Sequence, residues 1–266
     1  MKNLLEVENL SISFDTGNGW FKAVDGISFG VAAGKIACIV GQSGSGKSLT
    51  ALSIINMVPP SGKIEGRILF KEQDLLALPP YKMAQIRGRH IFSIFQNPMN
   101  SLNRSITTGK QLFEMAVSHG AQDKGKFYRD MGKILERMNF SNPYSVLRKY
   151  PFQLSGGMLQ RMVIAFAVYS KPELIIADEP TTALDVTVQK EILRQFREIR
   201  DQWGATILLI THDFGVVAEI ADDVIVMKEG RIVEKNGVRQ IFNYPRDAYT
   251  KALIKATFDK EVDQTC

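Results

Sequence analysis

A short apolar run followed by a glycine-rich loop constrains the fold of this chain more than any other feature. Residues 36–40 are continuously apolar and of strand length, and residues 41–48 read Gly-Gln-Ser-Gly-Ser-Gly-Lys-Ser, which fits the spacing G-x-x-x-x-G-K-S. The residues from Lys47 to about Met57 have helical character and end before two prolines. The order of strand, glycine-rich loop and helix predicts a loop that wraps around phosphate groups.

Each residue type in this loop has a physical reason to be there. Glycines allow a tight turn whose backbone N–H groups point inward, and the positive end of the following helix faces the same point. Lys47 can reach the terminal phosphates of a nucleotide, and the hydroxyl of Ser48 can bind Mg²⁺. A flexible Gly/Ser loop is the alternative, but the position between a strand and a helix favours nucleotide binding. The loop alone does not distinguish a kinase, a GTPase and a transport ATPase.

Predicted strands and helices alternate on both sides of a helical stretch. The expected strands are 5–14, 23–31, 36–40, 174–177, 205–210 and 224–227. Residues from about 97 to 160 show helical periodicity and few β-branched runs, which indicates a helical insert. An amphipathic helix is expected over 188–203, and the tail from Gln240 is predicted to be helical. This pattern predicts an α/β fold with a mostly parallel sheet and helices on its faces.

A pair of carboxylates follows the predicted strand 174–177. Ligands of open α/β sheets bind at the carboxyl ends of the strands, and Asp178 and Glu179 stand at such an end. Asp178 is therefore placed to hold Mg²⁺ through water, and Glu179 to polarise an attacking water. A solvated strand end is the alternative for an isolated Asp-Glu pair, but the phosphate loop elsewhere in the chain favours the catalytic interpretation.

Composition excludes several classes of protein. The 266 residues are 45% hydrophobic and 23% charged, which is ordinary for a globular chain, and the net charge of +5 is too small to argue for nucleic acid. No apolar run reaches the roughly 18 residues of a spanning helix, and the N-terminus lacks the features of a signal peptide, so we expect a cytoplasmic chain. Cys38 is expected to be buried. Cys266 ends the sequence, and neither a disulfide nor a metal site is expected.

Further motifs occur in an order that resembles the ATP-binding-cassette (ABC) ATPases. Gln96, within Phe-Gln-Asn-Pro, is similar to the Q-loop glutamine of that family, and Leu-Ser-Gly-Gly-Met at 154–158 resembles its signature motif. Ala-Leu-Asp at 183–185 resembles the D-loop, and His212 resembles the switch histidine. Phe14 stands where the family has the aromatic residue that stacks on adenine. The resemblance covers about residues 4–255.

Each of these residues also has a structural interpretation of its own. Phe14 could be a core residue, the signature-like run could be a helix cap, and Gln96 and His212 could be ordinary loop residues. Two positions depart from the common family pattern, since Met158 replaces a frequent Gln and Phe14 a frequent Tyr. Stacking needs the face of an aromatic ring and not a hydroxyl, so neither departure contradicts an ATPase.

The resemblance implies the P-loop NTPase fold of the ABC type. This fold has a RecA-like parallel sheet core, N-terminal antiparallel strands and an inserted helical subdomain. The nucleotide-binding core is then expected over residues 1–96 and 160–240, and the helical subdomain over 97–159, with the signature motif at its end. Residues 241–266 are expected to form a C-terminal tail.

The resemblance also implies which residues act on ATP and Mg²⁺. The expected ATP-binding residues are Phe14, Gly41, Gln42, Ser43, Gly44, Ser45, Gly46, Lys47, Ser48 and Leu49. The expected catalytic residues are Glu179, His212 and Gln96, and the expected Mg²⁺ ligands are Ser48, Gln96 and Asp178. The residues expected to contact ATP held by a partner subunit are Leu154, Ser155, Gly156, Gly157 and Met158, followed by the D-loop residues Ala183, Leu184 and Asp185.

In this family two ATPase subunits face each other head to tail around ATP, which closes the dimer until hydrolysis lets it open. The implied partners are a second ATPase subunit in a heterodimer, two membrane permease subunits and an extracytoplasmic substrate-binding protein, without nucleic acid. The chain is then expected at the cytoplasmic face of the cell membrane as a peripheral subunit.

The runs at 96–103, 150–162 and 176–186 are similar to the ATPases of peptide and nickel importers. Peptide importers often carry a longer C-terminal region with several cysteines, whereas the short tail and the run Tyr-Pro-Phe at 150–152 look more like a D-type subunit of nickel importers. Import of nickel or a nickel chelate is therefore the main expectation, and import of dipeptides or oligopeptides is the alternative. His90, His119 and His212 lack the spacing of nickel ligands. The resemblance also implies that other subunits recognise the cargo, so no residue of this chain is expected to contact it.

Two further classes fit the sequence less well. ABC proteins of DNA repair carry a long coiled-coil insert, and those of translation usually carry two cassettes, whereas this chain has one phosphate loop and an insert of about sixty residues. A scaffold without ATPase activity is disfavoured because every expected catalytic position is occupied by a suitable residue.

Overall fold

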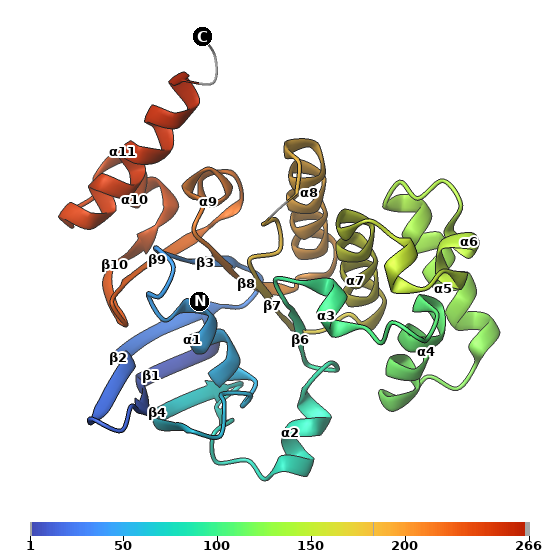
Figure 1. Ribbon diagram of the computed structural model, residues 1–266, viewed down its shortest axis with the longest axis horizontal. Coiled ribbons are helices and arrows are strands. Elements are labelled where there is room, and N and C mark those ends of the chain that lie inside the picture. Colours follow the sequence, from blue (N-terminus) through green and yellow to red (C-terminus); the bar gives the residue numbers. More distant parts are fainter. Residues whose placement is uncertain (1, 183, 264–266) are drawn as a thin grey trace. The chain divides into compact units, whose positions relative to one another are not determined.

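The computed structural model describes residues 2–182 and 184–263. These residues form two compact units, the first built from 2–84 and 206–263 and the second from 85–182 and 184–205. Figure 1 labels the elements along the chain.

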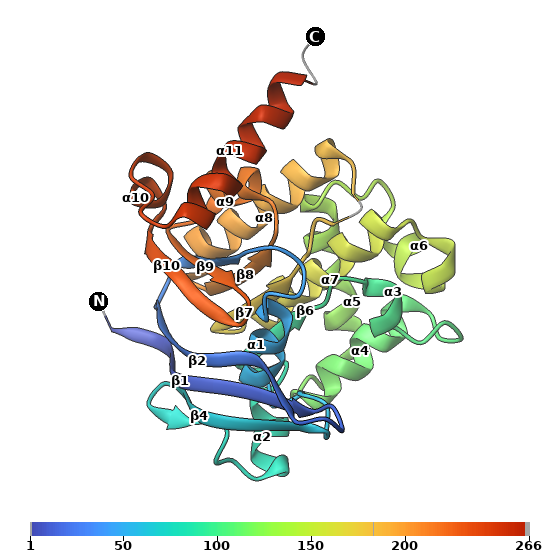
Figure 2. The same cartoon turned by 60° about the vertical axis from the view of Figure 1, so that its left-hand side comes forward.

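An antiparallel sheet forms one part of the first unit. Its strands are β1 (Asn3–Asp15), β2 (Trp20–Ala32), β4 (Gly62–Phe70) and β5 (Gln73–Asp74), in the order β2-β1-β4-β5. Figure 2 shows β2, β1 and β4 side by side. Alternate residues of β1 are buried at its N-terminal end, so one side of the sheet faces the core as the alternating sequence predicts. The expected antiparallel N-terminal strands are thus confirmed.

A second group of strands in the first unit is mostly parallel. β3 (Ile36–Val40) pairs in parallel with β8 (Thr206–Thr211) and with β9 (Asp223–Lys228), and β10 (Arg231–Gly237) pairs antiparallel to β9. Every residue of β3 and β8 is buried, which is typical of parallel strands covered on both faces. The helices of this unit are α1 (Lys47–Ile54), α9 (Phe214–Ile220), α10 (Val238–Asn243) and α11 (Ala248–Asp263). α2 (Pro80–Ile86) crosses the boundary between the two units.

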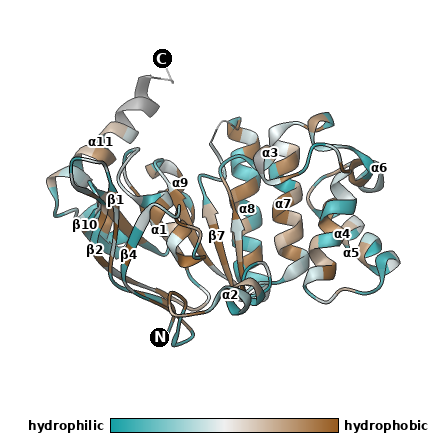
Figure 3. Ribbon diagram, turned by 60° about the horizontal axis from the view of Figure 1, so that its bottom comes forward, coloured by the Kyte–Doolittle hydropathy of each residue, from teal (hydrophilic) through white to brown (hydrophobic). Residues whose placement is uncertain are grey.

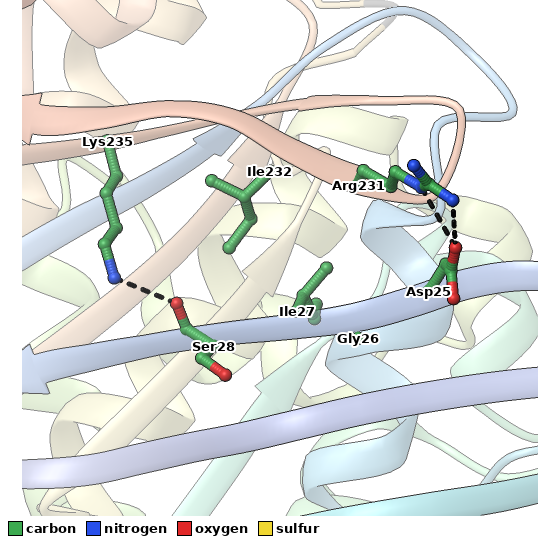
Figure 4. Close-up of a pocket in the computed structure, with 7 residues that line it drawn as sticks. All are labelled: Asp25, Gly26, Ile27, Ser28, Arg231, Ile232 and Lys235. Atoms are coloured by element: carbon green, nitrogen blue, oxygen red, sulfur yellow. Dashed lines mark hydrogen bonds and ion pairs between the residues drawn. The ribbon is translucent and has the colours of Figure 1, made fainter.

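Charged side chains join the two groups of strands within the first unit. Arg231 of β10 donates from Nε and Nη2 to Oδ2 of Asp25 in β2, at 2.9 and 2.6 Å. Lys235 donates from Nζ to the backbone oxygen of Ser28 at 3.0 Å. These residues line an open pocket of about 440 Å³, which Figure 4 shows with both interactions.

The second unit combines two strands with most of the helices. β6 (Ile91–Ile94) and β7 (Leu174–Asp178) are parallel to each other. The helices are α3 (Pro98–Ser101), α4 (Thr108–Ser118), α5 (Lys124–Arg137), α6 (Pro143–Arg148), α7 (Gly156–Ser170) and α8 (Val186–Trp203), with a 3₁₀ turn at Pro151–Gln153. Figure 3 shows hydrophobic and hydrophilic stretches along α8, as expected for a helix with one buried face.

The unit boundaries differ from the predicted insert 97–159, because α7 packs on β6 and α8 as well as on α5. The rings of Phe92 in β6 and Phe166 in α7 lie 5.8 Å apart, so the strands and the helices share one core. The predicted subdomain boundaries stay a prediction.

α1 ends at Ile54 and not near Met57, and Asn56 has a φ of +50°, which no helix can continue through.

The burial of Cys38 is an expectation that the structure can test. Cys38 is fully buried as predicted, and burial raises the pKa of its thiol. Cys266 lies outside the described residues. Over residues 2–182 and 184–263, no helix is long and apolar enough to cross a membrane, and no group of three His, Cys, Asp or Glu side chains is placed to hold a metal ion.

Candidate nucleotide-binding site

The glycine-rich loop begins at the carboxyl end of β3 and is held closely by its surroundings. A Cβ atom on Gly41 would collide with the backbone oxygen of Met227 at the end of β9. Gly46 has a φ of +96°, and a Cβ there would lie 2.7 Å from the backbone oxygen of Ala23 in β2. Side chains are therefore excluded at both positions, and the spacing of the glycines in the sequence has a structural reason.

Lys47 lies folded over this loop. Its side chain is 6% exposed, and its Nζ donates to the backbone oxygens of Gly41 and Gln42, both at 2.8 Å. The hydroxyl of Ser45 lies 3.4 Å from the same ammonium group. The one positive charge of the loop is thus fixed at its centre, where an anion enclosed by the loop would meet it.

The start of α1 supplies the remaining donors of the loop. Gly46 is the N-cap of α1 and has no side chain that could cap the helix. The N–H groups at a helix N-terminus form an anion site. The hydroxyl of Thr50 donates to the backbone oxygen of Gly46 at 2.9 Å and fixes the first turn. Ammonium, N–H groups and the exposed hydroxyl of Ser48 together fit a phosphate chain with Mg²⁺.

His212 leaves the parallel strands at the same edge as this loop. Val40 of β3 pairs with Thr211 of β8, so Gly41 and His212 each stand one residue beyond their strand. His212 is exposed. Asp213 next to it accepts from the N–H of Gly215 at 2.7 Å and begins α9, which fixes the backbone behind the histidine.

Phe14 lies at the end of β1 and is half-buried. It pairs with Phe21 of β2 on one side and with Gly62 of β4 on the other. A Cβ on Gly62 would lie 2.9 Å from Cε1 of Phe14, so the ring covers this glycine. The structure thus gives Phe14 a packing role, while Phe21 opposite it is 60% exposed.

The carboxylates predicted from the sequence stand in the second unit, at the end of β7. Asp178 and Glu179 are half-buried. Ile94 of β6 pairs with Ala177, so Gln96 and Glu179 each stand two residues beyond paired positions at the same edge. Gln96 is exposed. The sequence therefore predicts correctly that Asp178 and Glu179 follow the carboxyl end of a strand, whereas β6, the strand before Gln96, was not predicted.

Glu179 has an unusual backbone and a side-chain partner that sequence reasoning missed. Its φ is +50°, and its Oε2 accepts from the hydroxyl of Thr182 at 2.6 Å. The signal available in the sequence was a hydroxyl three residues after a carboxylate, a common spacing that is not specific by itself.

The run at 154–158 begins α7. Ser155 is its N-cap, and its Oγ accepts from the N–H of Met158 at 3.2 Å, while Leu154 is buried. A Cβ on Gly157 would lie 3.1 Å from Cγ1 of Val188, so this glycine lets α7 approach α8. The capping interpretation is correct, and the exposed Ser155 and Gly156 also leave the positive end of a helix at the surface.

The residues expected to form the D-loop precede α8. Ala183 lies outside the described residues. The N–H of Leu184 donates to the backbone oxygen of Thr181 at 3.3 Å, and Asp185 caps α8 by accepting from Val188 at 2.9 Å. A turn and a cap therefore fix the described part of this segment.

A family model described as ABC transporter matches residues 24–182, more than half of the chain. The chain belongs to this family, and it is an ATP-hydrolysing subunit of the ABC transporter type with the P-loop fold. The fold class expected from the sequence is thereby confirmed.

Individual relatives show the kind of transporter ATPase that the chain is similar to. The chain is 45% identical to the dipeptide transport ATP-binding protein DppD of Bacillus subtilis over 256 residues, which cover 96% of this chain and 76% of DppD. It is 41% identical to the oligopeptide transport ATP-binding protein OppD of Lactococcus lactis over 256 residues, which cover 96% of this chain and 76% of OppD. Among solved structures, a dimeric bacterial ABC transporter cassette, MJ0796, has a TM-score of 0.79 at 25% identity, covering 88% of this chain and 99% of the other.

Both relatives are named for peptide transport, which favours the alternative expectation over the nickel expectation. The preference for nickel depended on the end of the chain and on three residues at 150–152. The similarity to DppD instead extends over 96% of the chain and is therefore the broader observation.

Proposed function

We propose that this chain hydrolyses ATP to power a peptide importer. The observation that carries the proposal is the 45% identity to a dipeptide transport ATP-binding protein over 96% of the chain. The carboxylates, the phosphate loop and the signature-like run fall inside this aligned body of the chain. Nickel import, the main expectation from the sequence, is the outcome against which the proposal is tested.

The first unit would bind the nucleotide. Lys47, fixed at the centre of the loop, would neutralise charge on the terminal phosphates, and the N–H groups of the loop and of α1 would hold the phosphate chain. His212 would contact the γ-phosphate from the carboxyl end of β8. Phe14 would stack on adenine, although its ring already covers Gly62.

The second unit would supply the hydrolytic groups. Glu179 would orient and polarise the attacking water, held in place by the hydroxyl of Thr182. Ser48 would offer its hydroxyl oxygen to Mg²⁺, and Gln96 and Asp178 are the further ligands that the family resemblance implies. When bound, Mg²⁺ neutralises charge that develops on the phosphate oxygens.

Assembly is part of the same proposal. Ser155 and Gly157 would face ATP held by a second ATPase subunit, because α7 begins there with its positive end exposed. The similarity to a cassette that is dimeric in its solved structure supports this arrangement. The chain would lie at the cytoplasmic face of the membrane, where two separate permease subunits would supply the spanning segments. An extracytoplasmic binding protein would deliver the cargo.

Uptake in cells tests the cargo. A strain that lacks this chain should lose accumulation of a labelled dipeptide or oligopeptide and keep normal accumulation of nickel. Wild type should restore peptide uptake, and Lys47→Ala should not. Loss of nickel uptake with intact peptide uptake would overturn the peptide assignment and leave the ATPase chemistry untouched.

Turnover of the purified chain tests the mechanism separately. Glu179→Gln keeps the shape of the side chain and removes its charge, so nucleotide binding should persist while hydrolysis falls by about a hundredfold or more. An unchanged steady-state rate would refute the role of Glu179.

A further inference from the structure

The C-terminal helix reaches the phosphate loop through one side chain. The backbone N–H of Gln42 donates to the hydroxyl oxygen of Tyr249, the second residue of α11, at 2.9 Å. The two residues are 207 positions apart in the sequence and belong to the same unit. Nothing in the motif pattern connects the tail with the loop.

The same residue of the loop also holds Lys47. The backbone oxygen of Gln42 accepts from Nζ of Lys47 at 2.8 Å. Both backbone groups of Gln42 are therefore bound by side chains: its N–H by Tyr249 and its oxygen by Lys47, the residue at the centre of the loop. A shift of the Gln42 backbone would move an acceptor of the ammonium group.

Tyr249 has two further contacts of its own, and a carboxylate of β10 fixes the segment just before it. Nζ of Lys228, at the end of β9, lies 5.4 Å from the centre of its ring. Its own N–H donates to Oδ1 of Asp247 at 2.7 Å. Glu234 of β10 accepts from the N–H groups of Arg246 and Asp247, at 2.9 and 3.1 Å, just before α11 begins. Figures 1 and 2 show α11 beside β10, as its contacts require.

We propose that Tyr249 is a positioning residue for the phosphate loop, so that the C-terminal segment sets the fraction of molecules whose loop can bind nucleotide. The proposal rests on the proposed role of residues 41–49 as the nucleotide loop. A loop of glycines and serines has many backbone conformations, and a fixed external acceptor removes some of them. When only a fraction of the molecules has a competent loop, the apparent Kd rises by the inverse of that fraction.

Removal of the hydroxyl tests this role. Tyr249→Phe keeps the ring beneath Lys228 and removes the acceptor of the Gln42 N–H. Calorimetry with ADP and Mg²⁺ on the full purified chain, well below its melting temperature, should give an affinity about three- to tenfold weaker, the range for one lost hydrogen bond. Tyr249→Ala should weaken it further. Tyr244→Phe, at a tyrosine that is 69% exposed, is the matched control and should bind as wild type does.

Hydrogen exchange at the Gln42 amide separates positioning from general stability. In Tyr249→Phe this amide should exchange faster, whereas amides in the middle of β3 should keep their protection. An unchanged Kd in Tyr249→Phe would overturn the proposal, and so would a lower melting temperature without a change in Kd. Wild-type chain that fails to bind ADP at all would instead contradict the nucleotide loop itself.

Discussion

The hydroxyl of Thr182 donates a 2.6 Å hydrogen bond to Oε2 of Glu179, and the N–H of Thr182 donates to the backbone oxygen of the same glutamate. Glu179 has a φ of +50°, a conformation that costs a residue with a side chain about 1–2 kcal/mol. Two hydrogen bonds from one residue offset this cost and fix the direction of the carboxylate. Strain of this kind is typical of positions where orientation matters for function.

The first prediction concerns Thr182. Thr182→Val keeps the size of the side chain and removes the hydroxyl, so the carboxylate of Glu179 loses its orientation. We expect the rate of ATP hydrolysis to fall by roughly tenfold, since a misplaced general base loses most of its effect. Affinity for ATP should stay within about twofold of wild type, because the lost hydrogen bond joins two residues of the chain and does not reach the nucleotide.

Thr182→Ser is the matched control for this prediction. It retains the hydroxyl and should retain most of the hydrolysis rate. Steady-state release of phosphate from both variants is the measurement, and equal rates for the valine and serine variants would show that the hydrogen bond does not serve the reaction.

The second prediction concerns the charge at the centre of the phosphate loop. Lys47→Ala removes the ammonium group and its bonds to the backbone oxygens of Gly41 and Gln42, so we expect affinity for ADP with Mg²⁺ to fall at least about tenfold. Calorimetry measures this loss directly.

Lys47→Arg distinguishes charge from shape. The native side chain is 6% exposed, and a planar guanidinium needs more room than a compact ammonium, so arginine should not restore binding. Restored affinity in Lys47→Arg would mean that only the charge matters and that the close fit of Lys47 does not.

The third prediction is a dependence on pH at the start of α11. Burial opposes the ionisation of Glu234, but the N–H groups of Arg246 and Asp247 bind its carboxylate and hold its pKa below the ordinary value. The ionised carboxylate therefore stabilises this segment fully at pH values above the titration of glutamate in the unfolded chain, near pH 4. This contribution is lost as the pH falls through the lower folded pKa.

Hydrogen exchange of residues 246–253 as a function of pH measures this effect. After correction for intrinsic exchange, protection should be constant from neutral pH down to about pH 5 and should decrease at lower pH. Glu234→Gln should already show reduced protection at pH 7 and little further change in this range. A decrease of the same size in the glutamine variant would assign the pH effect to another group.

Local patterns were enough to predict the central elements of the fold and the polar residues that follow them. The strand at 36–40 and the strand that ends at Asp178 are apolar throughout and are followed by functional residue types, so periodicity and motif agree. β4 and β10 were not predicted, because most of their residues are exposed or half-buried and their sequences lack a clear alternation.

Contacts between distant residues could not be predicted at all. Tyr249 reads as one aromatic residue of a polar tail, and its bond to Gln42 depends on β10 holding the start of α11. For Phe14 the sequence predicts a role in binding but misses the contact that the side chain makes within the fold. Its place in the family pattern predicts stacking on adenine, but only the structure shows that its ring covers Gly62.

The fourth prediction tests the core of the second unit. Phe127 of α5 is fully buried, and its ring meets those of Tyr128 and Tyr169 edge to face, with centroids 5.4 and 5.0 Å apart. Phe127→Ala should lower the free energy of unfolding by about 3–5 kcal/mol, the cost of a cavity of this size. Phe152→Ala, at a ring that is 62% exposed in the same unit, should change it by no more than about 0.5 kcal/mol.

The two tryptophans let the units be followed separately. Trp203 ends α8 in the second unit, and Trp20 begins β2 in the first, so Trp20→Phe leaves a fluorescence signal from the second unit alone. Urea unfolding in this background should show a lower midpoint for Phe127→Ala and a nearly unchanged one for Phe152→Ala. Equal midpoints for the two variants would mean that the aromatic cluster around Phe127 does not stabilise the helices it joins, because an exposed ring and a buried one would then be equivalent.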